Sequence, residues 1–255
     1  MGIKPQDFYD LLIKNDIKFF TGVPDSLLKE FCLCLDEKIN KSNHIIAANE
    51  GSAVAIAAGH HIGTGKVPLV YMQNSGLGNA INPLLSLCDK EVYSIPLIML
   101  IGWRGEPNVN DEPQHIKQGK IQLELLKILD IPYVVISKEE DDLNKKIVSI
   151  INQARENNKP CAIVVKKKTF LNYGGKNKNI SSNLFLREEA LEILLNQIND
   201  NSIIVSTTGK TSREIFELRK AKKQQHDRDF LTVGSMGHCS SIALGIALSN
   251  NKRKV

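Results

Sequence analysis

The chain has 255 residues, of which 42% are hydrophobic and 24% are charged. This composition is ordinary for a globular protein, and a chain of this length can bury one large core or two smaller ones. The formal net charge of +5 comes from scattered lysines without interleaved aromatic residues, which argues against a nucleic-acid partner. No apolar run approaches the roughly 20 residues of a membrane span, and the first residues lack the apolar core of a signal peptide. We therefore expect a cytoplasmic protein that binds neither nucleic acid nor membrane.

Short β-branched runs alternate with amphipathic stretches through residues 1–168. This alternation is typical of parallel strands joined by crossover helices, and it predicts an α/β fold with a six-stranded parallel sheet flanked by helices. The predicted strands lie at 17–21, 45–47, 67–72, 95–101, 133–136 and 161–165. The predicted helices lie at 6–15, 26–39, 50–59, 114–128 and 139–156. We expect the strand at 45–47 to be short and buried.

The composition changes after residue 168. Residues 169–183 carry a Gly-Gly pair and a run of Asn, Lys and Ser, which is typical of an interdomain linker. A second α/β unit follows at 184–255, with predicted helices at 187–198, 211–222 and 236–249 and predicted strands at 202–206 and 230–233. Two strands cannot bury three helices, so we expect the chain to stop in the middle of this second domain.

Three polar segments follow predicted strands, at the edge of the sheet where α/β proteins place ligands. In the turn at 21–26, Asp25 or Ser26 is expected to cap the next helix, with a ligand contact as the alternative. In the polar loop at 73–79, Asn74 and Ser75 are either turn formers or ligand contacts. Residues 102–115 are the longest irregular segment of the first half, and long loops inside compact domains tend to be functional.

A single carboxylate stands where the strand at 45–47 changes into an alanine-rich helix. Glu50 lies in the first turn of that helix, where the helix dipole favours a negative charge. The alanines at 53, 57 and 58 leave one helix side small enough for another backbone or a flat ligand to approach closely. The simpler interpretation is an ordinary glutamate at the start of a helix. The alternative is a functional carboxylate, and the choice between them depends on the other motifs of the chain.

Common phosphate-binding motifs are absent. The pairs Gly65-Lys66 and Gly209-Lys210 both lack the first glycine that a P-loop requires, and there is no dinucleotide fingerprint. The sequence also contains no His-Glu-x-x-His, no Gly-x-Ser-x-Gly and no metal-ligand spacing among its histidines. Residues 207–209 and 233–237 nevertheless lie between a predicted strand and a helix, where free backbone N–H groups suit an anion.

Four segments together resemble a known family: residues 20–26 (FTGVPDS), 48–59 (ANEGSAVAIAAG), 73–83 (QNSGLGNAINP) and 232–238 (TVGSMGH). They are similar to the thiamine-diphosphate-dependent 2-oxo acid decarboxylases. Within that superfamily the chain most resembles the phosphonopyruvate decarboxylase group, with the sulfopyruvate decarboxylases as near relatives. The resemblance implies a thiamine-diphosphate-binding fold, in which residues 1–168 form the pyrimidine-binding domain and 184–255 the N-terminal part of the diphosphate-binding domain.

The resemblance also implies roles for single residues toward the cofactor. Glu50 would hydrogen-bond N1′ of the aminopyrimidine and so promote removal of the thiazolium C2 proton. Residues 234–237 would bend the cofactor, with Met236 as the apolar wedge between its rings. The remaining candidates for cofactor binding are Asn74, Thr208, Gly209, Gly234 and Ser235.

The implied reaction is the decarboxylation of 3-phosphonopyruvate to phosphonoacetaldehyde and carbon dioxide. Asp25 and His115 are candidates for proton transfer, and Arg104 is the first candidate to bind the phosphonate because its fork suits that group. Lys117 and Lys120 are weaker candidates for the same role. The alternatives are another 2-oxo acid decarboxylase, such as that for sulfopyruvate, and a non-catalytic subunit that keeps the pyrimidine-domain fold.

The family also uses Mg²⁺, which bridges the diphosphate to oxygen ligands of the protein. The family's metal motif should begin just after Val255, so the metal ligands of this protein are not identified in its sequence. We expect a truncated chain or, less readily, one whose domain is completed by another chain. The resemblance further implies a homo-oligomer whose active site lies between subunits.

Overall fold

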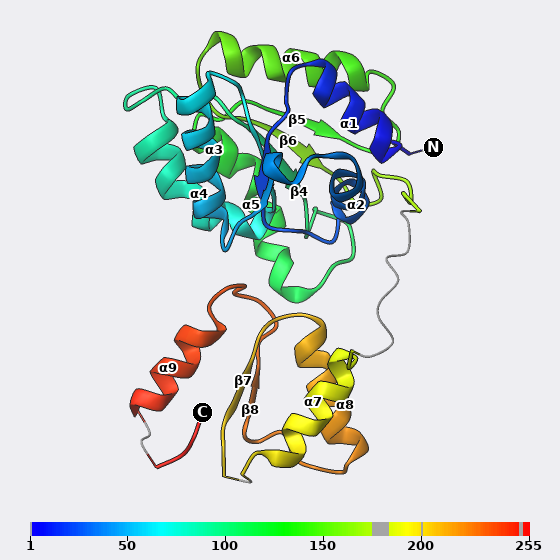
Figure 1. Cartoon of the computed structure of the whole chain (residues 1–255), viewed down its shortest axis with the longest axis vertical. Helices are drawn as coiled ribbons and strands as arrows, with labels where there is room; N and C mark the ends of the chain where they lie inside the picture. The colour runs from blue at the N-terminus through cyan, green and yellow to red at the C-terminus, as the bar shows by residue number, and fades with distance from the viewer. Residues whose placement is uncertain (1, 175–183, 200, 250–251) are drawn as a thin grey trace. The chain divides into compact units, whose positions relative to one another are not determined.

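The computed structural model describes residues 2–174, 184–199, 201–249 and 252–255. The chain divides into two compact units, Met1–Lys176 and Asn177–Val255 (Figure 1). Most of the predicted linker at 169–183 lies outside the described residues. Each unit is described below by itself.

The first unit is built on a parallel sheet of six strands in the order β2-β1-β3-β4-β6-β5. The strands are β1 (Phe20–Gly22), β2 (His44–Ile46), β3 (Leu69–Gln73), β4 (Ile98–Gly102), β5 (Tyr133–Ile136) and β6 (Cys161–Val165). The helices are α1 (Pro5–Lys14), α2 (Lys29–Lys38), α3 (Glu50–Thr64), α4 (Leu77–Pro83), α5 (Pro113–Ile128) and α6 (Leu143–Glu156). The predicted six-stranded parallel sheet flanked by helices is therefore confirmed.

The helices cover both faces of this sheet, because side chains along each strand point alternately to one face and the other. On one face, Phe8 of α1, Phe31 of α2 and Ile147 of α6 pack against strand residues such as Leu100. On the other face, small residues of α3 and α4 and Leu126 of α5 pack against Met72, Met99 and Ile101. The central strands β3, β4 and β6 are buried on both faces, as continuous apolar runs in a parallel sheet require.

Strand β1 is the point at which the order of strands reverses. It pairs with β2 on one side and with β3 on the other, in parallel register through Gly22, which faces both Ile46 and Tyr71. The crossover from β1 to β2 uses α2 on one face, and the crossover from β2 to β3 uses α3 on the opposite face. A crevice outside the carboxyl ends of the strands at such a reversal is where open α/β sheets bind ligands.

Two local predictions for this unit were wrong. Strand β2 was expected to be buried, but it forms an edge of the sheet, and Ile46 is 60% exposed. The polar segment at 73–79 was expected to be a loop, but it is a 3₁₀ turn (Asn74–Gly76) that leads into α4. The chain continues after α4 as a π-helical segment, Leu84–Cys88, and a short 3₁₀ helix, Lys41–Asn43, precedes β2.

The second unit contains two described strands, β7 (Ile204–Ser206) and β8 (Asp229–Leu231), which pair in parallel. Its helices are α7 (Arg187–Gln197), α8 (Lys210–Ala221) and α9 (Cys239–Ser249). A small core of Leu195, Ile215 and Leu218 joins α7 and α8 to the strands. No residue of α9 is buried within this unit.

Candidate functional site

The polar segments singled out in the sequence meet at the carboxyl edge of the first unit's sheet. Asp25 follows β1, Glu50 follows β2, Asn74 follows β3 and Arg104 follows β4. These four strands are neighbours in the order β2-β1-β3-β4, so their carboxyl ends line one continuous edge that includes the reversal at β1. The topology therefore gathers residues that are up to 79 positions apart in the sequence, from Asp25 to Arg104.

Glu50 is the first residue of α3 and is only 3% exposed. The helix is capped by Asn49, whose side chain accepts a hydrogen bond from the Ser52 N–H at 2.8 Å. Asn79 Nδ2 donates to Glu50 Oε2 at 2.8 Å, and no other described residue hydrogen-bonds this carboxylate. A buried carboxylate with one neutral partner retains an unused acceptor oxygen, Oε1, for a donor supplied by a ligand.

The unused oxygen of Glu50 is packed against the backbone of Gly76. A Cβ at residue 76 would lie 2.2 Å from Glu50 Oε1 and 2.4 Å from its carboxyl carbon. Only a glycine leaves space for the carboxylate at this position. The turn after β3 therefore fixes where Glu50 can be, and it does so with a flat backbone surface in place of a side chain.

Asp25 does not cap α2, because that helix begins at Lys29 and its N-cap position is Leu28, without a side-chain cap. Instead, Asp25 Oδ2 accepts from the Leu27 N–H at 2.9 Å, while Oδ1 is buried and has no hydrogen-bond partner in the described part of the chain. Burial raises the pKa of the Asp25 carboxyl, which outweighs the lowering effects of the Leu27 N–H and the Arg104 charge. Asp25 thus holds its proton more readily than a surface aspartate does.

Arg104 is locked into an ion pair with Asp111. Its Nε donates to Asp111 Oδ2 at 2.8 Å, its Nη2 donates to Oδ1, and its Nη1 donates to Ser26 Oγ at 3.0 Å. Asp111 also accepts from the Gly105 and Glu112 N–H groups, each at 2.8 Å. The Arg104 guanidinium and these N–H groups hold the pKa of the Asp111 carboxyl far below its usual range. Arg104 therefore reaches the edge with its charge already balanced and with two of its five N–H donors free of these contacts.

Asn74 joins the end of β3 to the end of β4. Its Nδ2 donates to the Arg104 carbonyl at 2.8 Å, and its Oδ1 accepts from the Arg104 N–H at 3.1 Å. Both polar ends of this buried side chain are thus engaged by backbone, as in a sheet ladder. The structure gives Asn74 a role in holding Arg104, and its contact with a cofactor stays a prediction.

His115 lies in the first turn of α5, beside the same loop. Its Nδ1 is buried without a hydrogen-bond partner among the described residues, and its backbone carbonyl would lie 2.0 Å from a Cβ at residue 105. Burial and the nearby Arg104 charge lower the pKa of His115, so the imidazole is neutral near pH 7 and can accept a proton. Trp103 closes the inner side of this loop by donating from Nε1 to the Gly119 carbonyl at 2.9 Å.

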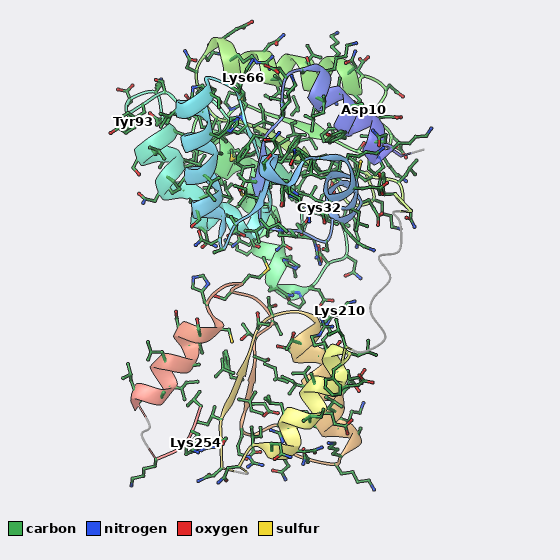
Figure 2. All side chains as sticks on the ribbon, in the orientation of Figure 1. Asp10, Cys32, Lys66, Tyr93, Lys210 and Lys254 are labelled. Atoms are coloured by element: carbon green, nitrogen blue, oxygen red, sulfur yellow. The ribbon has the colours of Figure 1, made fainter. Side chains whose placement is uncertain are left out.

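The second unit presents two loops at the carboxyl edge of its own strand pair. Residues 207–209 lead into α8, whose first residue, Lys210, is labelled in Figure 2, and Gly209 has a φ of 93° that favours glycine. Residues 232–238 follow β8 and turn sharply, with φ of 57° at Ser235 and 83° at Gly237. The buried Ser212 hydroxyl ties the two loops together, since it lies 2.7 Å from the Thr207 carbonyl and 3.3 Å from that of Thr232. Thr208, Gly209, Gly234, Ser235 and Met236 thus belong to one edge of this unit.

Sequence reasoning missed three residues that shape the first unit's edge, namely Asp111, Asn79 and Gly76. Asp111 lies in the irregular segment 102–115, which was predicted to be functional because of its length. Nothing in the local sequence indicated that Asp111 pairs with Arg104. Asn79 lies one helical turn beyond Gly76 in a segment predicted as a loop, so its reach back to Glu50 was not foreseen. A helical interpretation of residues 77–83 would have placed Asn79 on the side that faces α3.

Known proteins resemble this chain over much of its length. Residues 5–126 match the family model for the thiamine pyrophosphate enzyme, N-terminal TPP binding domain; thiamine pyrophosphate is thiamine diphosphate. A phosphonopyruvate decarboxylase from Streptomyces viridochromogenes is 30% identical over 224 residues, which are 81% of this chain and 54% of that protein. This chain spans about half the length of that relative.

Subunits of two sulfopyruvate decarboxylases match shorter parts of the chain. The sulfopyruvate decarboxylase subunit alpha of Methanococcus maripaludis is 34% identical over 125 residues, which are 49% of this chain and 72% of that subunit. The sulfopyruvate decarboxylase subunit beta of Methanothermobacter thermautotrophicus is 38% identical over 69 residues, which are 27% of this chain and 34% of that subunit. The fold, the matched TPP-binding domain and these relatives together show that the chain belongs to the family of thiamine-diphosphate-dependent 2-oxo acid decarboxylases.

Proposed function

We propose that this chain takes part in the thiamine-diphosphate-dependent decarboxylation of 3-phosphonopyruvate to phosphonoacetaldehyde and carbon dioxide. The observation that carries the proposal is the environment of Glu50. A carboxylate at the carboxyl edge of the sheet is buried, has one neutral hydrogen-bond partner among the described residues, and keeps one oxygen, packed against the backbone of Gly76, without such a partner. Burying such a group has a cost that a ligand donor would offset.

These residues fit the aminopyrimidine half of thiamine diphosphate. Glu50 Oε1 would share a proton with the ring nitrogen N1′, and Gly76, which has no side chain, leaves the Glu50 carboxylate the space it occupies. When bound, the cofactor supplies the acidic carbon that attacks the keto group and the electron sink for the carboxylate's departure. Glu50 holds and returns the proton at N1′, and the apolar side chains of α3 and β3 keep water away from it.

The second unit offers partners for the other half of the cofactor. The uncapped N-terminus of α8, with Thr208 and Gly209 before it, would direct backbone N–H groups and the helix dipole toward the diphosphate. The Gly234 carbonyl and the Met236 side chain would contact the pyrimidine and the bend between the rings. Mg²⁺ would hold the diphosphate through oxygen ligands. Among the described residues, no group of three or more His, Cys, Asp and Glu is placed to hold a metal ion.

The substrate would meet Asp25, His115 and Arg104. Burial raises the pKa of Asp25 and lowers the pKa of His115, and such perturbed groups at a sheet edge are candidates for proton transfer. The two remaining donors of Arg104 would bind the phosphonate, while Asp111 keeps the guanidinium in one orientation. Lys117 and Lys120 are both exposed on α5 and remain the secondary candidates for this role.

The test compares Glu50→Gln with the unchanged protein in its active assembly. Glutamine keeps the size of Glu50 but holds no ionisable proton, so turnover should fall by about 100-fold or more while the thermal midpoint is kept. Wild-type turnover in Glu50→Gln would refute the role of Glu50. Unchanged affinity for phosphonopyruvate in Arg104→Ala would refute the role of Arg104.

The substrate itself has a close alternative, because relatives of this chain include sulfopyruvate decarboxylase subunits. A sulfonate carries one negative charge near neutral pH, whereas a phosphonate carries up to two, so the two substrates differ mainly in charge. Steady-state rates with both substrates would decide between them. Those relatives are named as alpha and beta subunits, so native mass spectrometry of this chain alone is the test of the proposed homo-oligomer.

The non-catalytic alternative has its own test. A subunit that only keeps the fold would not bind thiamine diphosphate in any assembly. Calorimetric titration with thiamine diphosphate and Mg²⁺ distinguishes the two, since binding that is lost in Gly76→Ala favours a cofactor site beside Glu50.

A further inference from the structure

A lysine-rich cavity opens at the carboxyl ends of β5 and β6, in the first unit. Its volume is about 440 Å³. Three segments line it: residues 106–110 of the loop after β4, residues 137–139 after β5, and Lys166, Lys167 and Lys168 after β6. A cavity of this size falls in the range of small-molecule sites.

The charges around this cavity do not cancel. It is lined by four lysines (138, 166, 167 and 168) and two glutamates (106 and 139). Lys166 pairs with Glu106 at 2.6 Å, and Lys138 pairs with the exposed Glu139 at 3.5 Å. Within the described residues no carboxylate pairs with Lys167 or Lys168, so the cavity keeps two uncompensated positive charges.

The backbone that presents these lysines is held firmly. The Lys166 N–H donates to the Ile136 carbonyl at 3.0 Å, and the buried Thr169 hydroxyl donates to the Lys166 carbonyl at 2.8 Å. Lys168 has a φ of 62°, a conformation that costs a lysine free energy and that glycine or asparagine adopts more easily. Three consecutive ammonium groups are thus brought to one cavity by a turn that does not depend on their side chains.

The same cavity is connected to the loop that carries Arg104. Lys167 Nζ donates to the Asn110 carbonyl at 3.1 Å, and Asn110 is the residue before Asp111. Lys166 Nζ also lies over the Trp103 ring, 5.9 Å from its centroid, while pairing with Glu106. An anion that moves Lys166 or Lys167 toward the cavity would therefore change the Lys166–Trp103 contact at one end of this loop or the Lys167–Asn110 hydrogen bond at the other.

We propose that this cavity is a binding site for a small molecule bearing a dianionic phosphate or phosphonate group. Two uncompensated ammonium groups match the charge of such a group, and lysines bind it as point charges. The volume leaves space for an organic part beyond the anionic group. The site does not depend on the proposed decarboxylation, because its lining includes none of Asp25, Glu50, Arg104 and His115.

Trp103 provides the measurement, because it is the only tryptophan of the chain and contacts Lys166. The experiment titrates the 255-residue chain with inorganic phosphate and, separately, with methylphosphonate, at constant ionic strength set by chloride. We expect a saturable change in Trp103 fluorescence with each probe. A change that chloride reproduces at equal ionic strength would overturn the proposal, because it would reflect screening alone.

Variants locate the site. The double substitution Lys167→Gln and Lys168→Gln should weaken the apparent affinity by roughly tenfold, since it removes both uncompensated charges. The matched control, Lys38→Gln with Lys41→Gln, removes the same charge from exposed positions of this unit and should leave the titration unchanged. Equal affinities in the wild type and the Lys167/Lys168 variant would refute the site.

Two further variants separate charge from structure. Lys168→Gln alone leaves the Lys167–Asn110 hydrogen bond in place, so weaker binding in this variant cannot come from a loosened loop. Lys167→Arg with Lys168→Arg keeps both charges and should keep the saturable signal. Loss of the saturable fluorescence signal in this double arginine variant, with an unchanged thermal midpoint, would contradict a site based on charge. Tighter binding of methylphosphonate than of phosphate would identify an organic phosphonate as the ligand class, and the reverse would identify a phosphate.

Discussion

Glu50 and Arg104 lie at the same edge of one sheet, but only Arg104 is paired with an opposite charge among the described residues. Arg104 is matched by Asp111, which accepts four hydrogen bonds and has a side chain only 6% exposed. Among the described residues, no cation pairs with Glu50, which accepts a hydrogen bond from one neutral amide. A balanced charge can hold a loop in place, whereas an unbalanced buried charge favours whatever ligand supplies the missing donor. Arg104 is therefore held in a fixed framework, whereas Glu50 keeps an acceptor oxygen that the described residues do not use.

Gly76→Ala should have the largest effect. The new methyl group would overlap the Glu50 carboxylate, so either Glu50 or the turn after β3 must move. We expect a loss of about 2 to 3 kcal/mol in the free energy of unfolding, as for other overpacked sites. Denaturant unfolding measures it. Gly78→Ala is the matched control, because a Cβ there meets nothing within 4 Å and should leave the stability equal or higher.

Asp111→Asn should destabilise the chain by about 2 kcal/mol, because it leaves the Arg104 guanidinium partly buried without its counter-charge. The effect should depend on pH. The pKa of Asp111 is lowered in the folded state, so its stabilising contribution is present at neutral pH and is lost as pH falls toward the folded-state pKa. Unfolding midpoints of both proteins should therefore converge in acid. A constant difference across that range would show that the hydrogen-bond geometry matters more than the charge, and the exposed Asp141→Asn serves as the control.

Asn79→Ala removes the one hydrogen-bond partner that the Glu50 carboxylate has within the described part of the chain. Asn79 is itself exposed, so we expect a loss of only about 1 kcal/mol in stability. If Asn79 orients the Glu50 carboxylate, turnover of Asn79→Ala should fall more than the small loss of stability can explain. Turnover of Asn79→Asp should fall further, because this substitution places a second negative charge beside Glu50. The exposed Asn144→Ala on α6 provides the comparison, and an equal effect on turnover from both alanine variants would remove the orienting role.

Asp25→Asn should have the smallest effect on stability, and with the opposite sign. Burial raises the pKa of Asp25 in the folded state, so the ionised group costs stability at neutral pH and the protonated group does not. Asp25→Asn should raise the unfolding midpoint slightly at pH 7, and this gain should disappear below the usual aspartate pKa of about 3.9. A midpoint that falls at pH 7 would show that the Leu27 N–H and the Arg104 charge outweigh burial. Turnover should fall if Asp25 transfers a proton.

Much of the architecture follows from the pattern of the sequence. The alternation of apolar runs and amphipathic helices predicted the parallel sheet because each crossover has a local signature that does not depend on distant residues. Glu50 was placed correctly in the first turn of its helix, since Asn49, a good N-cap residue, marks that boundary. The irregular segment at 102–115 was recognised by its length and polarity, and it holds Arg104 and Asp111.

The predictions that were wrong or incomplete concern features that depend on contacts between distant segments of the chain. The exposure of β2 could not be predicted from its apolar residues, since a strand at an edge can have the same composition as one in the middle of a sheet. Asp25 resembles a helix cap in the sequence, but the helix starts later, at Lys29, and Asp25 lies against Gly102, where a Cβ would be 2.2 Å from its Oδ2. The pairing of Arg104 with Asp111 and Ser26 depends on the fold of a whole loop, which propensity does not describe.

Three glycines stand at or just after the ends of β1, β3 and β4, and each fills the place where a side chain would collide with a neighbour. A Cβ at Gly22 would lie 2.1 Å from the Tyr71 carbonyl, and those at Gly76 and Gly102 would each lie 2.2 Å from a carboxylate oxygen. The consequence concerns how this protein can change. A library of variants selected for a new substrate should leave these positions untouched and accumulate its successful substitutions at residues 107–110 of the loop after β4, which are exposed in this unit.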